Sequence, residues 1–208
     1  MAQPLSPDLT QLVALAAALG WASGLRLYAV VFIVGAVGAL GWVPLPSGLQ
    51  VLQSPWVLGA SFTMFAIEFL ADKVPGLDTL WDAVHTFIRI PAGAALAAAV
   101  LGSMGADHAA WTAIAALLGG TLAATAHAAK STIRVAANAS PEPFSNVALS
   151  LAGDVAVPTL LWLAWAHPWV FFPVLALTLA LAVVAIAVLF KFLRALWRRF
   201  APRPAAAG

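Results

Sequence analysis

Seven apolar segments alternate with short polar or proline-rich breaks along the chain. They cover residues 9–22, 25–43, 55–72, 91–104, 108–129, 145–166 and 169–190. A helix needs about 20 apolar residues to cross a bilayer, and most of the segments approach or exceed that length. The segments at 9–22 and 91–104 are only about 20 Å long as helices, so we interpret them as half-helices or tilted pieces. The pattern predicts an all-α polytopic membrane bundle.

Composition agrees with this class and excludes others. The chain of 208 residues is 63% hydrophobic and 9% charged, whereas soluble domains carry about 25% charged residues. A net charge of +2 is no signature of nucleic-acid binding. The absence of cysteine excludes disulfides, thiolate metal sites and cysteine nucleophiles. We expect one integral membrane domain over residues 1–208, with no cleaved signal because no basic residue precedes the first apolar segment.

Basic residues predict the orientation of the chain. Five of them follow the last apolar segment, in the tail 191–208: Lys191, Arg194, Arg198, Arg199 and Arg203. The positive-inside rule places this end in the cytoplasm. Counting back through seven crossings places the N-terminus outside and every basic residue, Arg26 included, on the cytoplasmic side. The loops assigned to the outside, at 43–54, 103–108 and 167–168, contain no Lys or Arg.

The stretch 67–89 holds six of the chain's eighteen formal charges. Glu68 and Asp72 lie one helical turn apart, and Lys73 follows them. In a second helix over 77–90, four residues fall on one stripe: Asp78, Asp82, His85 and Arg89.

Pro91 follows this helix and is expected to end or kink it, since proline lacks a backbone donor. Two placements of the 77–90 helix remain open. It lies flat on the cytoplasmic leaflet with its stripe toward water, or it is tucked into the bundle with its stripe lining a polar cavity.

A second polar group follows in the sequence. One helical stripe holds His127, Lys130, Arg134 and Asn138, the next turn holds Glu142, and one flank of the following helix holds Asn146, Ser150 and Asp154. A charge at the bilayer centre costs at least about 2.5–3.5 kcal/mol, so such residues pair, face a wet cavity or carry function. The alternative to a functional role is a structural clamp, for example Asp154 paired with Lys130 or Arg134.

A short repeat links the two polar groups. Residues 86–94 read TFIRIPAGA and residues 131–139 read STIRVAANA, with four of nine positions identical. One copy leads into an outward-going helix and the other ends an inward-going one. Opposed copies of one element are how inverted-repeat transporters are built, so the match indicates a weak inverted repeat.

Four segments together carry a family resemblance: GLRLY (24–28), EFLADKVPG (68–76), LWDAVH (80–85) and SPEPFSN (140–146). The chain resembles, from about residue 10 to 190, the bacterial membrane-protein family catalogued as domain of unknown function 4126. The resemblance implies a multi-pass protein of the bacterial inner membrane. It implies no activity.

We interpret the protein as a small channel or secondary transporter for an ion or small polar solute, with a possible link to protons. Glu68 or Asp154 would take up the proton, since burial favours the neutral form of a carboxyl group, and His85 and His127 would relay it. The basic residues would balance charge and form a cytoplasmic gate: Arg26, Lys73, Arg89, Lys130 and Arg134.

Other functions stay open. They are a lipid-handling protein, a membrane-embedded enzyme, and a structural membrane protein without transport. The sequence contains no phosphate-cradling glycine loop, no dinucleotide fingerprint and no zinc-protease motif, so we expect no cofactor and no metal. The expected partners are the lipid bilayer, the small solute and, in a homodimer, a second copy of the chain.

Overall fold

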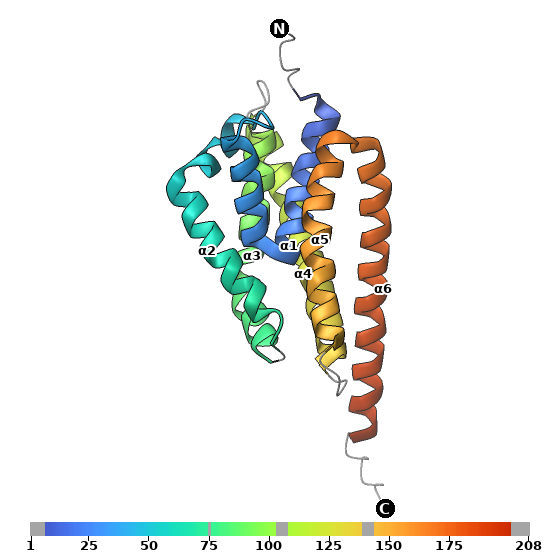
Figure 1. Cartoon of the computed structure of the whole chain (residues 1–208). Coiled ribbons are helices and arrows are strands. Elements are labelled where there is room, and N and C mark those ends of the chain that lie inside the picture. The colour runs from blue at the N-terminus through green and yellow to red at the C-terminus, as the bar shows by residue number, and fades with distance from the viewer. Residues whose placement is uncertain (1–6, 75, 103–107, 139–143, 201–208) are drawn as a thin grey trace, which may run out of the picture.

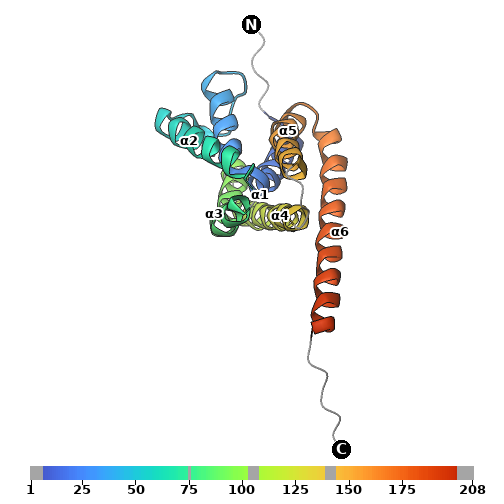
Figure 2. The same ribbon diagram turned by 60° about the horizontal axis from the view of Figure 1, so that its bottom comes forward.

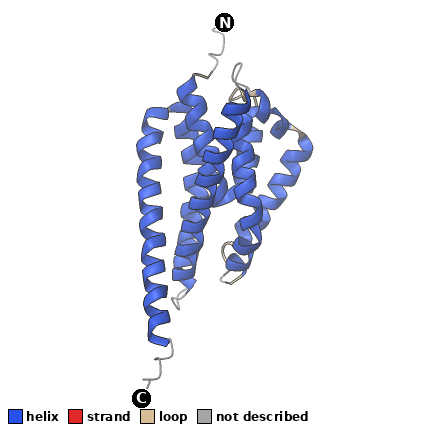
Figure 3. Cartoon of the chain, turned by 180° about the vertical axis from the view of Figure 1, so that it is seen from behind, coloured by secondary structure: helices blue, strands red, loops and turns tan. Residues whose placement is uncertain are grey.

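The computed structural model describes residues 7–74, 76–102, 108–138 and 144–200, and every regular element in them is a helix (Figure 3). In chain order these are α1 (Leu9–Ala39), the short 3₁₀ helix η1 (Ser47–Gln53), α2 (Pro55–Ala71), α3 (Leu77–Leu101), α4 (His108–Asn138), α5 (Phe144–Ala166) and α6 (Pro168–Phe200). Among the described residues, five helices (α1, α3, α4, α5 and α6) are by length and composition apolar enough to cross a membrane. The bent pair of η1 and α2, with an angle of 72° between them, is a sixth candidate. The predicted all-α polytopic bundle is confirmed.

Helix α1 is broken at Arg26, whose φ of −149° and ψ of 84° are not helical. In the first arm, Gln11 donates to the carbonyl of Trp165 at the end of α5. In the second arm, Gly35 lies against Leu52, just before α2. Because α2 to α5 alternate in direction, the end of α5 and the start of α2 lie at one end of the bundle (Figure 1). Helix α1 is therefore a hairpin whose tip is Arg26.

This hairpin refines the expected segments at 9–22 and 25–43. Both are helical, but they are arms that meet inside the bundle, and Arg26 at their junction is only 1% exposed. The sequence placed Arg26 at a cytoplasmic boundary, where it would be solvated. The start of α1 and the end of α6 lie at opposite ends of the bundle (Figure 1).

Helix α3 runs without a break through Pro91. Of the two expected effects of this proline, an end or a kink, the end of the helix is therefore wrong. Inside a bilayer a helix satisfies its backbone groups internally, and neighbouring helices tolerate a proline. The segments 77–90 and 91–104 thus belong to one element. Its polar stripe faces the bundle, while Leu80 and Phe87 on the opposite side are 62% and 83% exposed. This arrangement contradicts a stripe turned toward water.

Glycines bring α1, α3 and α4 into close contact. A Cβ on Gly20 would lie 2.7 Å from the Cα of Gly119, and one on Gly93 would lie 2.6 Å from the Cβ of Ala123. Small residues allow such close approach of helix backbones in membranes. These three helices form the centre of the molecule, and their close packing fixes the depth at which the polar stripes of α3 and α4 meet.

Helices α2 and α6 lie on opposite flanks of this centre (Figure 2). Helix α2 packs mainly on α1, and α6 packs on α4 and α5. Much of the apolar surface of α6 is exposed, including Leu177, Leu181 and Val184, as expected for a helix that faces lipid.

Candidate functional site

Ten charged side chains form one connected set of ion pairs in the bundle, which we call the charge network. Its acids are Glu68, Asp72, Asp78, Asp82 and Asp154, and its bases are Arg26, Lys73, Arg89, Lys130 and Arg134. Five acids balance five bases, so the fully ionised network is neutral. Such pairing offsets the cost of placing the charges in a bilayer.

Arg26 occupies one end of the network. Its Nη1 lies 2.9 Å from Asp72 Oδ2, and its Nε lies 2.8 Å from Asp154 Oδ1. Its Nη2 donates to the backbone carbonyl and to the Oγ of Ser150, at 3.0 and 2.9 Å. Lys73 also reaches Asp154, at 3.5 Å. The break in α1 thus points one guanidinium at both α2 and α5.

Arg89 occupies the other end and is fully buried. Its Nη2 donates to Glu68, which is itself fully buried, and its Nη1 lies 2.7 Å from Asp82 Oδ1. The same Nη1 lies 3.1 Å from His127 Nδ1, and His127 Nε2 lies 2.7 Å from the hydroxyl of Thr86. This end is a closely packed clamp between α2, α3 and α4.

Lys130 of α4 connects the two ends, and Arg134 of the same helix links Asp72 to Asp78. Lys130 Nζ lies 3.0 Å from both Asp72 Oδ2 and Asp82 Oδ1. Arg134 donates to the Asp72 backbone carbonyl at 2.7 Å and lies 3.4 Å from Asp78 Oδ2. Because Asp72 is the C-cap of α2, where the helix dipole disfavours a negative charge, these cations stabilise a carboxylate in an unfavourable position.

The amides predicted for the site lie at the end of the bundle where α4 and α5 approach each other. Asn138 donates to Asp78 Oδ1 at 3.2 Å, and Asn146 donates to Asn138. Glu142 lies outside the described residues. Asp154 paired with Lys130 or Arg134 was the example given for a structural clamp, but Asp154 pairs instead with Arg26 and Lys73. The tip of α1 contacts both helices, since Arg26 lies near Gly153 of α5 and Gly24 lies against Ala123 of α4.

His85 lies at the edge of the network and contacts aromatic side chains. Its Nδ1 bonds to the carbonyl of Trp81, its Nε2 lies 3.2 Å from the Tyr28 hydroxyl, and its ring stacks on Trp81 at 4.0 Å. Sequence analysis did not select Tyr28 or Thr86. Tyr28 is the one tyrosine of the chain and follows Arg26 by two residues. These two features could have marked Tyr28 as a candidate from the sequence.

The first copy of the predicted repeat lies in α3 and residues 131–138 of the second lie in the antiparallel neighbour α4, while residue 139 lies outside the described residues. Their arginines have different partners, however. Arg89 pairs with Glu68 and Asp82, and Arg134 pairs with Asp72 and Asp78. The two copies therefore do not provide equivalent halves of one site.

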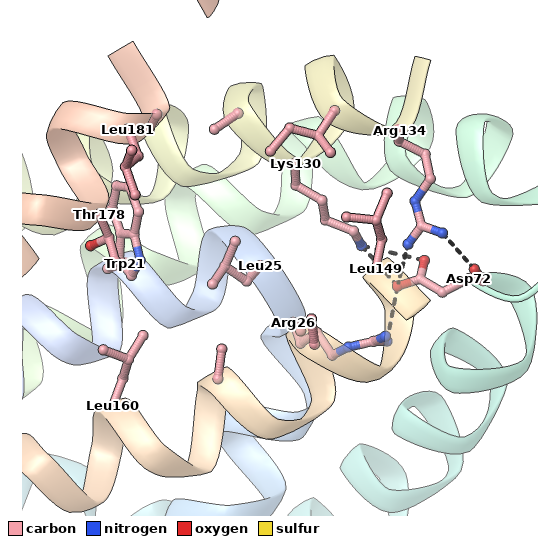
Figure 4. Close-up of a pocket in the computed structure, with 16 residues that line it drawn as sticks. Trp21, Leu25, Arg26, Asp72, Lys130, Arg134, Leu149, Leu160, Thr178 and Leu181 are labelled. Carbon is pink, nitrogen blue, oxygen red and sulfur yellow. Dashed lines mark hydrogen bonds and ion pairs between the residues drawn. The ribbon is translucent and has the colours of Figure 1, made fainter. Parts of the chain in front are cut away.

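A cavity of about 300 Å³ adjoins the network between α1, α4, α5 and α6 (Figure 4). Three bases and one acid of the network line its charged end: Arg26, Lys130, Arg134 and Asp72. The remaining walls are almost entirely apolar, and Trp21, Leu160 and Leu181 belong to them. The site can hold a small molecule against fixed charges in surroundings of low polarity.

Comparison with known families identifies the protein at the level of its family. A family model described as "Domain of unknown function (DUF4126)" matches residues 13–188. The chain belongs to the DUF4126 family. The match contains all ten members of the charge network. A search of curated proteins and of solved structures finds no significant match.

This member of the DUF4126 family is thus a multi-pass membrane bundle with a buried, charge-balanced network. Within the part of the chain that the structure describes, no three His, Asp or Glu side chains are grouped to hold a metal ion. The chemistry that the residues offer is ion pairing, proton uptake by a carboxylate, and the binding of an anion by guanidinium and ammonium groups.

Proposed function

We propose that this protein is a small secondary transporter that moves a charged or polar solute, linked to protons, and that the solute binds beside the tip of α1. The observation that carries the proposal is Arg26. It is a buried arginine at a non-helical break, paired with two acids and lining the cavity.

A helix broken at membrane depth has a physical cost. Its unpaired backbone groups are tolerated where they are buried in protein or line a cavity. Broken helices form the solute and ion sites of many transporters, where helix ends and charged groups converge. A protein that needed its charges only as a clamp would be served by unbroken helices.

The charge balance supports a link to protons. A solute anion that enters the neutral network adds an uncompensated charge, which is costly in this environment. Protonation of one carboxylate removes that excess and releases its basic partner to the solute.

Asp154 is better placed than Glu68 to take up this proton. The Asp154 side chain is 15% exposed, whereas that of Glu68 is inaccessible and paired with Arg89. Neutral Asp154 would free the Nε of Arg26, which lines the cavity. We assign Glu68 to the clamp at the other end.

Proteoliposomes containing a pH-sensitive dye test the proposal under an imposed proton gradient. We expect flux above that of protein-free liposomes for the wild type and at least a tenfold loss for Asp154→Asn. Asp8→Asn is the matched control, because Asp8 is the exposed N-cap of α1 and asparagine caps equally well. Wild-type protein that is folded yet gives no flux above empty liposomes would contradict a proton-linked transporter.

A structural membrane protein is the second candidate, and the equal number of acids and bases favours it. If the network only clamps the helices, Asp154→Asn lowers thermal stability and alters no flux. The homodimer, the cytoplasmic position of the C-terminus and the inner-membrane location stay predictions, and nothing in the site favours an enzyme over these functions.

A further inference from the structure

The cavity beside Arg26 has two chemically distinct parts (Figure 4). At one end lie the side chains of Arg26, Lys130 and Arg134. The other part is walled by apolar residues of α1, α5 and α6, among them Trp21, Leu160 and Leu181. A pocket with one charged end and a long apolar wall is complementary to a molecule built in the same way.

The charged end is an anion site that the chain fills with its own carboxylate. Three cationic groups surround Asp72 Oδ2, with Arg26 Nη1 at 2.9 Å, Lys130 Nζ at 3.0 Å and Arg134 Nη2 at 3.6 Å. Among the residues that line the cavity, three bases face this one acid. The charged groups that line the cavity are therefore mostly cationic, and the acids that balance them, Asp78, Asp82 and Asp154, lie outside its lining.

Arg26 is almost fully buried, and two of its nitrogens are engaged by carboxylates of the chain itself. It is 1% exposed, and its Nε and Nη1 make no hydrogen bond of ordinary geometry, although both lie at ion-pair distance from carboxylates. A guanidinium offers five N–H donors in a planar fork that suits carboxylate and phosphate oxygens. An arriving anionic headgroup would compete with Asp72 and Asp154 for this buried guanidinium, and that pairing is an observation independent of the cavity's shape.

We propose that the cavity binds an anionic amphiphile. Its carboxylate or phosphate lies against Arg26, Lys130 and Arg134, beside Asp72 or in its place, and its apolar chain lies along Trp21 and Leu160. This inference rests on the proposed function and names the class of its solute.

The apolar walls distinguish this ligand from a bare inorganic anion. A chain that lies along these walls makes many close apolar contacts, each weakly attractive and together substantial, and an inorganic ion makes none of them. Ile133 and Leu181 line the cavity and are 41% and 60% exposed. The cavity is thus accessible from the lipid-facing flank, which is the side from which an amphiphile would arrive.

Native mass spectrometry of the purified protein in a neutral detergent tests the headgroup. The probes are oleate, phosphatidylglycerol, phosphatidylcholine and inorganic phosphate. We expect one oleate or phosphatidylglycerol per chain, bound at least tenfold tighter than phosphatidylcholine. The two favoured probes distinguish a single-chain carboxylate from a phospholipid. Equal binding of all three amphiphiles, or binding of inorganic phosphate as tight as that of oleate, would overturn the inference.

Variants locate the bound molecule in this cavity. Ala182 of α6 lines the cavity and is buried, whereas Ala180 is exposed and outside it, so Ala182→Phe fills the site and Ala180→Phe is its matched control. We expect the first to weaken binding at least tenfold and the second to leave it unchanged. Ala156→Leu, a milder filling of the same cavity, provides the test if Ala182→Phe does not fold. Unchanged binding in a folded cavity-filling variant would refute the assignment.

The outcomes also separate this inference from the proposed function. Selective binding of oleate or phosphatidylglycerol without proton flux would support the site while refuting the transporter. Proton flux with no preference for anionic amphiphiles would support the transporter and overturn the site's assignment.

Discussion

Replacing Arg89 by glutamine tests whether the charge network stabilises the fold. Arg89 has no exposed surface, and it donates to Glu68 and Asp82. Asp82 keeps Lys130 at 3.0 Å after the change. Glu68 loses the cation paired with it, and its Oε2 already has no hydrogen-bond partner. The variant therefore leaves about one uncompensated buried carboxylate.

The expected cost follows from that single charge. Removing one partner of a buried ion pair destabilises a protein by about 3–5 kcal/mol. Glu68→Gln is expected to cost less, about 1–3 kcal/mol, because Arg89 retains Asp82. In the double variant no charge is left unpaired. Its loss should therefore be smaller than the sum of the single losses by about 0.5–3 kcal/mol, the usual range for residues in contact.

The free energy of unfolding can be measured by denaturant titration in mixed micelles, with tryptophan fluorescence as the signal. Asp8→Asn serves again as the control, since it neutralises an exposed acid outside the network. An Arg89→Gln variant within about 0.5 kcal/mol of the wild type would refute the reasoning, since surface substitutions have effects of that size. Strictly additive losses in the double variant would refute the pairing of Arg89 with Glu68.

Two further predictions concern packing and the tip of α1. Gly119→Ala should lower the free energy of unfolding by about 1–3 kcal/mol through overpacking, since its new Cβ would lie 2.6 Å from the Gly93 carbonyl oxygen. Gly59→Ala is the control and should cost nothing in the same titration, because its Cβ would have nothing within 4 Å. Arg26→Lys should reduce proteoliposome flux at least tenfold. One ammonium cannot replace a guanidinium that contacts Asp72, Asp154 and Ser150 through separate nitrogens. Wild-type flux in this variant would contradict the role of the guanidinium.

Periodicity predicted the polar stripes well, because it depends on local helical geometry. Asp78, Asp82 and Arg89 were expected on one face of a helix, and the structure buries all three. The direction of that face was not predictable from periodicity alone. A stripe turned to water and a stripe turned to a polar interior have the same sequence pattern, and only the packing of α1 and α4 against α3 distinguishes them.

The partners of the charges were not predictable either. Five acids and five bases can pair in many ways, and helix packing selects among them. Lys130 and Arg134 were named as example partners of Asp154 in a structural clamp, but the hairpin tip places Arg26 against it. The signal for that hairpin was present in two features: the short first apolar segment and the Ala-Ser-Gly break at 22–24. Its depth depends on the close contacts of Gly20 and Gly24 with α4.

Cysteine labelling tests the central claim, that α1 turns back at Arg26, most directly. The chain has no cysteine of its own, so single cysteines can be placed at Pro7, Trp42, His167, Val74 and Lys191 and labelled in sealed vesicles with a membrane-impermeant maleimide. We predict that positions 7, 42 and 167 react from one side of the membrane and positions 74 and 191 from the other. Labelling of positions 7 and 42 from opposite sides would show that α1 crosses as a single span, and would contradict the hairpin on which the proposed transport site depends.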